Sequence, residues 1–206
     1  LISEPGANVA RGRNIAVSQA SHNVIASVDL GCHLDAAWLE RIGLELRGPR
    51  QLQALEQIEV ELDDLRAAWS NMLEQLDCPA LLNAVIALAQ YFDLRNRQQD
   101  AQQLFGASLA ALERVSLPPG APPAEMATLK AYLLAFYGLA LFAQGEFDPA
   151  LAAYQQALAL TGRLAEPHRQ RIHVLLFFGM WLLPGLEIDQ LYRDCRAYFE
   201  RSGDRW

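Results

Sequence analysis

The residues of this sequence that could do chemistry are few and scattered. Cys32 and His33 are adjacent and offer two zinc ligands, but a tetrahedral zinc site needs four ligands and no second pair follows at a recognisable spacing. The sequence has three cysteines, Cys32, Cys78 and Cys195. They are odd in number and far apart, which is not typical of a disulfide framework. We therefore expect no metal site, and a reducing cytoplasm as the compartment.

Signatures of nucleotide binding and hydrolysis are missing as well. The only lysine, Lys130, has no glycine directly before it, whereas a P-loop holds phosphates with Gly-rich backbone amides and a lysine. The sequence contains no His-Glu-x-x-His helix, no Gly-x-Ser-x-Gly elbow and no Cys-x-x-Cys pair. His168 and His173 fall in the first turns of a predicted helix, where capping and solvent contacts explain them as well as catalysis does. We expect no catalytic residue and no cofactor, and we therefore expect that the protein is not an enzyme.

The charge balance excludes a further class of ligand. The 206 residues carry a net charge of −7, from 17 basic and 24 acidic residues, and an acidic run contributes much of it: Glu56, Glu59, Glu61, Asp63 and Asp64. Contacts to phosphate need clustered positive charge, so we expect no direct binding of nucleic acid. We interpret the acidic run as the solvated face of a helix.

Helical periodicity dominates from about residue 34 onward, and no alternating strand pattern interrupts it, so the predicted class is all-α. The longest uncharged apolar runs, 131–143 and 174–183, are shorter than the roughly 18 residues that a membrane span needs, which predicts buried helices and no membrane. Residues 1–33 show no signal peptide and are expected to be an irregular or helical lead-in. A start without Met and an abrupt end at 204–206 indicate a piece of a longer protein.

The segment 34–77 is predicted to hold two helices. The first ends at Gly48-Pro49, because proline cannot continue the helical hydrogen bonding. The second carries apolar residues at alternating steps of three and four: Leu55, Ile58, Leu62, Leu65, Trp69, Met72 and Leu76. This heptad stripe is typical of a helix packed against its neighbours and also of a coiled-coil dimer seam, so both interpretations stay open.

Residues 78–206 are predicted to form antiparallel helix pairs. The pairs comprise 79–95 with 98–115, 124–144 with 147–162, and 167–184 with 187–202, with a Pro-rich break at 117–123. Asp148 and Pro149 predict the start of the fourth of these helices, since aspartate caps free amides and proline suits a first turn.

One pair carries a sequence pattern that resembles the tetratricopeptide repeat. In residues 131–162 the matching positions are Tyr137, Gly138, Leu141, Gly145, Phe147, Ala150, Tyr154, Ala157 and Leu158. Small residues at Gly138 and Ala150 let two helices approach closely. The resemblance implies an α-solenoid of degenerate tetratricopeptide-like repeats.

Two weaker copies flank this pair. The upstream copy contains Leu88, Ala89, Phe92, Asn96, Ala101, Phe105 and Leu109 in the same relative order. There Asn96 matches Gly145, and both residue types tolerate a left-handed turn. The downstream copy aligns Gly179 with Gly138, and Leu191, Cys195 and Tyr198 with Ala150, Tyr154 and Ala157.

A second resemblance concerns the wider context. The segment Leu62-Asp63-Asp64-Leu65-Arg66-Ala67-Ala68-Trp69, followed by Tyr91-Phe92-Asp93-Leu94-Arg95-Asn96, resembles the region after the nucleotide-binding module in bacterial signal-transduction (STAND-type) ATPases and related transcriptional regulators. It covers about residues 40–206. The resemblance implies that 34–77 precedes the repeats and that 78–206 is a repeat region truncated at its C-terminal end. It also implies a bacterial, cytoplasmic signalling protein.

The expected function is therefore non-catalytic binding, because stacked helix pairs create a concave face that receives a partner. The partner is a peptide, a protein, another domain of the parent chain or a small effector. Seven residues on the inner helix surface are the candidate contacts: Asn83, Gln90, Asp93, Tyr132, Phe142, His173 and Met180. The alternative is a homodimer or structural scaffold formed through the heptad stripe.

Overall fold

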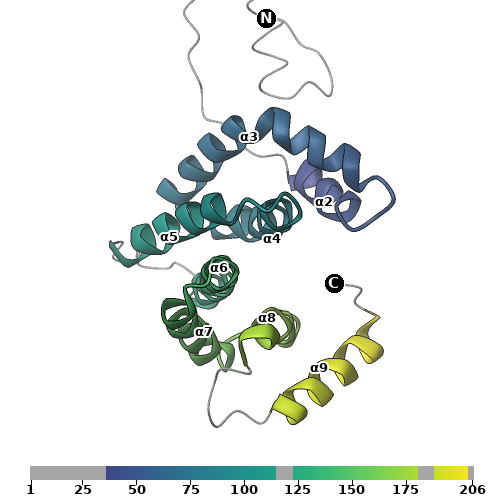
Figure 1. Ribbon diagram of the computed structural model, residues 1–206, viewed down its shortest axis with the longest axis vertical. Helices are drawn as coiled ribbons and strands as arrows, with labels where there is room; N and C mark the ends of the chain where they lie inside the picture. The colour runs from purple at the N-terminus through teal and green to yellow at the C-terminus, as the bar shows by residue number, and fades with distance from the viewer. Residues whose placement is uncertain (1–35, 115–122, 181–187, 204–206) are drawn as a thin grey trace, which may run out of the picture. The chain divides into compact units, whose positions relative to one another are not determined.

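The computed structural model describes residues 36–114, 123–180 and 188–203, and every regular element in these ranges is an α-helix (Figure 1). The described helices are α2 (Ala36–Glu45), α3 (Gln51–Glu74), α4 (Cys78–Leu94), α5 (Gln98–Arg114), α6 (Pro123–Ala143), α7 (Phe147–Thr161), α8 (Glu166–Met180) and α9 (Ile188–Ser202). The all-α prediction is confirmed, and most of the predicted helix ends fall close to those observed. The predicted lead-in at 1–33, with Cys32 and His33, lies outside the described residues.

The chain divides into two compact units, Leu1–Asn83 and Ala84–Trp206, with the boundary inside α4. In the first unit α2 contacts α3. Six residues of the α3 stripe are only 1–6% exposed: Leu55, Ile58, Leu62, Leu65, Trp69 and Met72. Because these side chains are already covered within the chain, a second copy could use the stripe as a seam only by displacing what covers it.

Three helices end in the same kind of turn, with one residue at positive φ. Leu76 and Asn96 each have φ 54° and Gly145 has φ 82°. In each turn the next residue donates its backbone N–H to a carbonyl five residues back: Asp77 to Met72 (2.9 Å), Arg97 to Phe92 (2.7 Å) and Glu146 to Leu141 (3.0 Å). This is the Schellman arrangement, which satisfies carbonyls left free at a helix end. It confirms the left-handed turns predicted at Asn96 and Gly145.

The start of α7 differs from the prediction in one detail. The turn at Gly145 makes Glu146 the residue before the helix and Phe147 its first residue, and Glu146 forms no side-chain capping bond. Asp148 is therefore inside the first turn, where a carboxylate interacts favourably with the helix dipole but is not the N-cap. The predicted capping role of Asp148 is wrong, although the helix begins where expected.

In the second unit α6 is the central helix. It contacts α5, α7 and α8, and α8 also contacts α7 and α9. Among the described helices α6 alone is long and apolar enough, over Ala124–Ala143, to span a membrane by length and composition, so the apolar stretch is longer than the run at 131–143 considered in the sequence. This stretch is 61% buried inside the structure, which agrees with the prediction of a buried helix.

The close approach of α6 and α7 depends on a glycine. A Cβ atom added to Gly138 would lie 2.5 Å from Cε1 of Tyr154 and 3.3 Å from the carbonyl oxygen of Ala150. Ala150 and Tyr154 are both fully buried. Since real Cβ atoms do not approach another carbon this closely, the ring of Tyr154 occupies the space that any larger residue at 138 would need. The predicted contact between Gly138 and Ala150 is therefore present.

Candidate functional site

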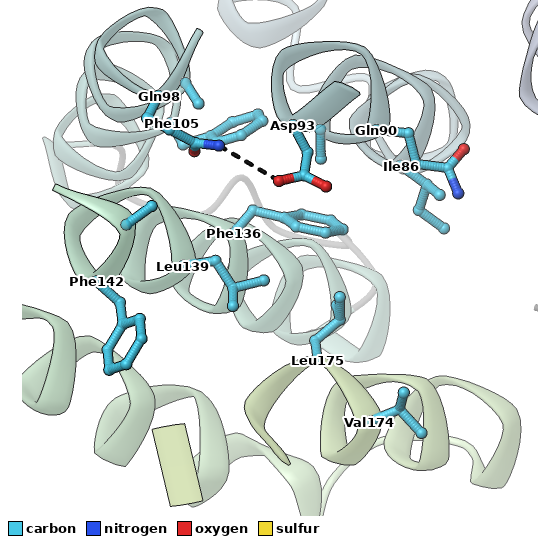
Figure 2. Close-up of a pocket in the computed structure, with 13 residues that line it drawn as sticks. Ile86, Gln90, Asp93, Gln98, Phe105, Phe136, Leu139, Phe142, Val174 and Leu175 are labelled. Atoms are coloured by element: carbon cyan, nitrogen blue, oxygen red, sulfur yellow. Dashed lines mark hydrogen bonds between the residues drawn. The ribbon is translucent and has the colours of Figure 1, made fainter. Parts of the chain in front are cut away.

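The second unit contains a cavity of about 480 Å³ with walls from four helices (Figure 2). The lining residues are mostly apolar. Those of α4 and α5 are Ile86, Ala89, Gln90, Asp93, Gln98, Ala101 and Phe105; those of α6 and α8 are Phe136, Leu139, Phe142, Ala143, Val174 and Leu175. A volume of this size is within the range of small-ligand and side-chain pockets in proteins, about 300–1,000 Å³.

Helical spacing explains why these residues share one cavity. On α4 the lining positions 86, 90 and 93 follow steps of four and three, which places their side chains on one face. On α6 the lining residues Phe136 and Leu139 are likewise three apart. Each helix therefore contributes one stripe, and the stripes of α4 and α6 face a common space.

A row of aromatic rings forms one side of the cavity and continues beyond it. Phe92 lies 6.1 Å from Phe105 between ring centroids, Phe105 lies 5.9 Å from Phe136, and Phe136 lies 6.1 Å from Tyr132. These separations fall in the range of favourable aromatic pairs, about 4.5–7 Å. Large aromatic rings in mutual contact therefore form this side of the cavity.

Two polar side chains of α4 face or border the cavity. The Oε1 atom of Gln90 is buried and has no hydrogen-bond partner among the described residues. One turn further, Oδ1 of Asp93 accepts a hydrogen bond from Nε2 of Gln98 at 3.3 Å, which Figure 2 draws as a dashed line. Both groups are hydrogen-bond acceptors, so the site suits a ligand that is apolar and carries a donor.

Three of the seven candidate contact residues meet at this cavity. Gln90 and Asp93 line it from α4, and Phe142 lines it from α6. The ring of Phe142 also packs edge-to-face against Phe147, with centroids 5.2 Å apart. These three positions therefore line one cavity of the second unit.

The other four candidates lie elsewhere. Tyr132 is 1% exposed, and its hydroxyl lies 3.2 Å from Nδ1 of His168, so it belongs to the packing between α6 and α8. His173 is 8% exposed and lines a separate cavity of about 330 Å³ formed by α8 and α9. Asn83 is exposed at the end of the first unit. Met180 ends α8, and its side chain lies outside the described residues.

The other ten lining residues of this cavity are not among the seven candidates. Ala89, Ala101 and Phe105 appear in the upstream repeat copy, while Phe136, Gln98 and Val174 were not singled out. Phe136 lies four residues after the candidate Tyr132 and on the same side of α6, so the i+4 position would have identified it. Gln98 has no such signal, because its place depends on the turn at Asn96.

The ionisable groups offer little reactive chemistry. Asp93 is the only ionisable residue among the described lining residues of the larger cavity. Among the described residues no three His, Cys, Asp or Glu side chains gather as a metal site. Burial and the nearby Asp194 raise the pKa of the Cys195 thiol to about 11, which keeps it protonated and unreactive as a nucleophile.

Comparisons with protein-family models, curated proteins and solved structures find no match to this chain.

Proposed function

We propose that this chain is a non-catalytic binding module, and that the cavity between α4, α5, α6 and α8 receives an apolar segment of a peptide or protein partner. Gln90 and Asp93 accept hydrogen bonds from backbone or side-chain N–H groups of that segment. Phe136, Leu139 and Phe142 contact its apolar side chains. The helix pairs act as tetratricopeptide-like repeats whose inner face forms the site.

The observation that carries this proposal is the buried Oε1 atom of Gln90, which has no hydrogen-bond partner among the described residues and lies in a mostly apolar wall. A buried acceptor without a hydrogen bond costs about 1–3 kcal/mol. A bound donor recovers that cost, and an apolar group beside it is stabilised by leaving water. The same atom therefore supplies both affinity and a requirement for an N–H or O–H group in the partner.

Binding is favoured over catalysis by the composition of the wall. Catalysis by proton transfer or nucleophilic attack needs two or more reactive groups in mutual reach. Among the described lining residues only Asp93 is ionisable, and its carboxylate accepts a hydrogen bond from the neutral amide of Gln98. An apolar cavity with two acceptors is suited to recognition.

The resemblance to STAND-type regulators supports a place for this module in bacterial signalling, where a repeat region detects a protein or effector in the cytoplasm. The alternative, a homodimer through the α3 stripe, is less favoured because Leu65 and Trp69 are buried within the chain. Light scattering of the wild-type chain separates the two: the binding proposal predicts a monomer, whereas a seam through the α3 stripe predicts a dimer.

The decisive experiment selects peptides from a phage-displayed library on the full chain and measures their affinities by isothermal titration. Leu139→Arg puts a charge in the cavity wall and is expected to weaken binding at least tenfold. Gln90→Leu removes the unpartnered acceptor and is expected to weaken binding of peptides that donate to it by about three- to tenfold, in line with a hydrogen bond worth about 1 kcal/mol.

Ala152→Arg, on an exposed face of α7, is the matched control and is expected to change nothing. Circular dichroism checks that each variant keeps its helix content. Peptides that bind Leu139→Arg as tightly as the wild-type chain, or a library that yields no binder, would contradict the proposal.

A further inference from the structure

The helices α8 and α9 form an antiparallel pair that is held together along its length. Arg201 pairs with Glu166 at 3.0 Å near one end, and the rings of Phe177 and Tyr192 lie 6.0 Å apart toward the other. Between them the thiol of Cys195 donates a hydrogen bond to Oε1 of Gln170 at 3.2 Å. The pair is therefore a defined surface rather than a loose C-terminal helix.

This pair has its own cavity of about 330 Å³, distinct from the larger cavity except for the shared Val174. From α9 the lining includes Leu191, Cys195 and Phe199, which are spaced by four residues and form one stripe. Eight residues of helix span about 12 Å, or roughly two turns. The cavity is thus an apolar groove along α9, long enough for two turns of another helix.

One polar group in this groove has no hydrogen-bond partner among the described residues. Nδ1 of His173 is buried and makes no hydrogen bond within the described part of the chain. Burial and the positive charge of Arg169 lower the pKa of His173, against the opposing effect of Asp194, so the imidazole is neutral near pH 7. A neutral imidazole nitrogen buried in an apolar groove is destabilising unless a bound group completes its hydrogen bond.

The preceding helix pair shows what completes it. A shift of 41 residues aligns Gly138 with Gly179 and Tyr154 with Cys195, and it aligns Tyr132 with His173. In the α6–α7 pair that position is satisfied by the next helix, since Tyr132 bonds His168 in the first turns of α8. Moreover α8 contacts both α6 and α7. The equivalent position on the α8–α9 pair is the one left unpartnered.

We propose that the α8–α9 groove is a docking site for an amphipathic helix of a partner protein, which lies on this pair as α8 lies on the α6–α7 pair. The partner helix places apolar residues at i, i+4 and i+7 against Leu191, Cys195 and Phe199, the spacing of helix-in-groove recognition. A side chain in its first turns forms the hydrogen bond to His173. This surface shares Val174 with the peptide site, but the proposal does not depend on that site.

The test selects binders to the full chain from a displayed library of 18-residue helical peptides with randomised apolar positions, and measures affinities by fluorescence anisotropy. Leu191→Arg is expected to weaken binding at least tenfold, and His173→Phe, which keeps an aromatic ring but removes the nitrogen, at least threefold. Ala197→Arg, exposed on α9 away from the groove, is the matched control and leaves affinity unchanged.

Leu139→Arg, in the larger cavity, is also expected to leave helix binding unchanged, so a failure of the peptide site is distinguishable from a failure of this one. If Leu191→Arg does not fold, Tyr192→Arg replaces it, because Tyr192 is 52% exposed and tolerates the charge. Selected helices that bind Leu191→Arg normally overturn the proposal. So does self-association of the wild-type chain that Leu191→Arg abolishes, because a second copy would then be the occupant.

Discussion

The hydroxyl of Tyr132 on α6 lies 3.2 Å from Nδ1 of His168 on α8, and the two rings meet edge-to-face with centroids 5.8 Å apart. This contact joins the central helix of the second unit to the helix that follows the α6–α7 pair. Tyr154 on α7 provides the opposite case, since its hydroxyl is buried without a partner among the described residues. Burial also raises the pKa of Tyr154, so its hydroxyl keeps its proton.

The two tyrosines make a matched pair for mutation. Tyr132→Phe removes a formed hydrogen bond and is expected to lower the free energy of unfolding by about 1 kcal/mol. Tyr154→Phe removes a hydroxyl that gains nothing from burial, so it is expected to leave stability unchanged or raise it by about 1 kcal/mol. Urea denaturation followed by circular dichroism measures both. Equal losses in the two variants would show that the Tyr132 contact contributes nothing specific.

Glycine substitutions test the close approach of α6 and α7. Gly138→Ala is expected to cost about 1–3 kcal/mol, because the new methyl group would sit 2.5 Å from Cε1 of Tyr154 and the buried ring has to shift. Gly162→Ala is the control, since nothing lies within 4 Å of its added Cβ and its φ is −62°. This substitution is expected to raise the free energy of unfolding by about 0.4–1 kcal/mol, because alanine leaves the unfolded chain fewer conformations than glycine does. A midpoint unchanged by Gly138→Ala would contradict the packing described.

The sequence was sufficient for the helices because apolar periodicity and breakers act locally. Pro49, Asn96 and Gly145 each mark the end of a helix or the turn that follows it, and the structure agrees. The turn at Leu76 was harder to predict, because its apolar side chain continues the heptad stripe while its backbone adopts the left-handed conformation. Leucine is an unusual residue in that conformation, so its helix propensity favoured a longer helix than the one observed.

The cavity was only partly predictable for a different reason. Helical spacing predicts that Gln90 and Asp93 share one face of their helix, because a face is a local property, and both line the cavity together with Phe142. Whether such a residue is covered depends on how far away the next helix packs, which spacing does not encode. Tyr132 shows this limit, since α8 approaches closely enough to bury it.

The left-handed turns give a third pair of variants. Gly145→Ala is expected to cost about 1 kcal/mol, because a Cβ atom at φ 82° meets the following carbonyl. Asn96→Gly is expected to gain a few tenths of a kcal/mol or more, since glycine adopts φ 54° without that clash. Both residues are exposed, so side-chain packing contributes little to either result. Thermal denaturation measures the pair, and a loss for Asn96→Gly would mean that the asparagine side chain itself stabilises the turn.

The lowered pKa values of the two histidines of α8, His168 and His173, predict how the stability of the fold changes with pH. Burial lowers the pKa of His168, with a contribution from Arg171, and burial and Arg169 lower that of His173, against Asp194. The unfolded chain, with histidine pKa near 6.5, therefore binds more protons than the folded chain just below that pH. Stability is expected to fall as pH drops from about 6.5 toward 5, by at most about 1.4 kcal/mol per pH unit for each histidine.

Urea denaturation at several pH values between 5 and 8 measures this slope, above the range where most carboxylates titrate. His173→Phe removes one titrating group and is expected to flatten the slope, because the unfolded chain then takes up one proton fewer. His168→Phe removes the second group, but it also removes the partner of Tyr132, so its stability should be lower at every pH as well as less pH-dependent. A slope that His173→Phe leaves unchanged would mean that this imidazole is already protonated in the folded chain at pH 6, contrary to its burial in an apolar groove.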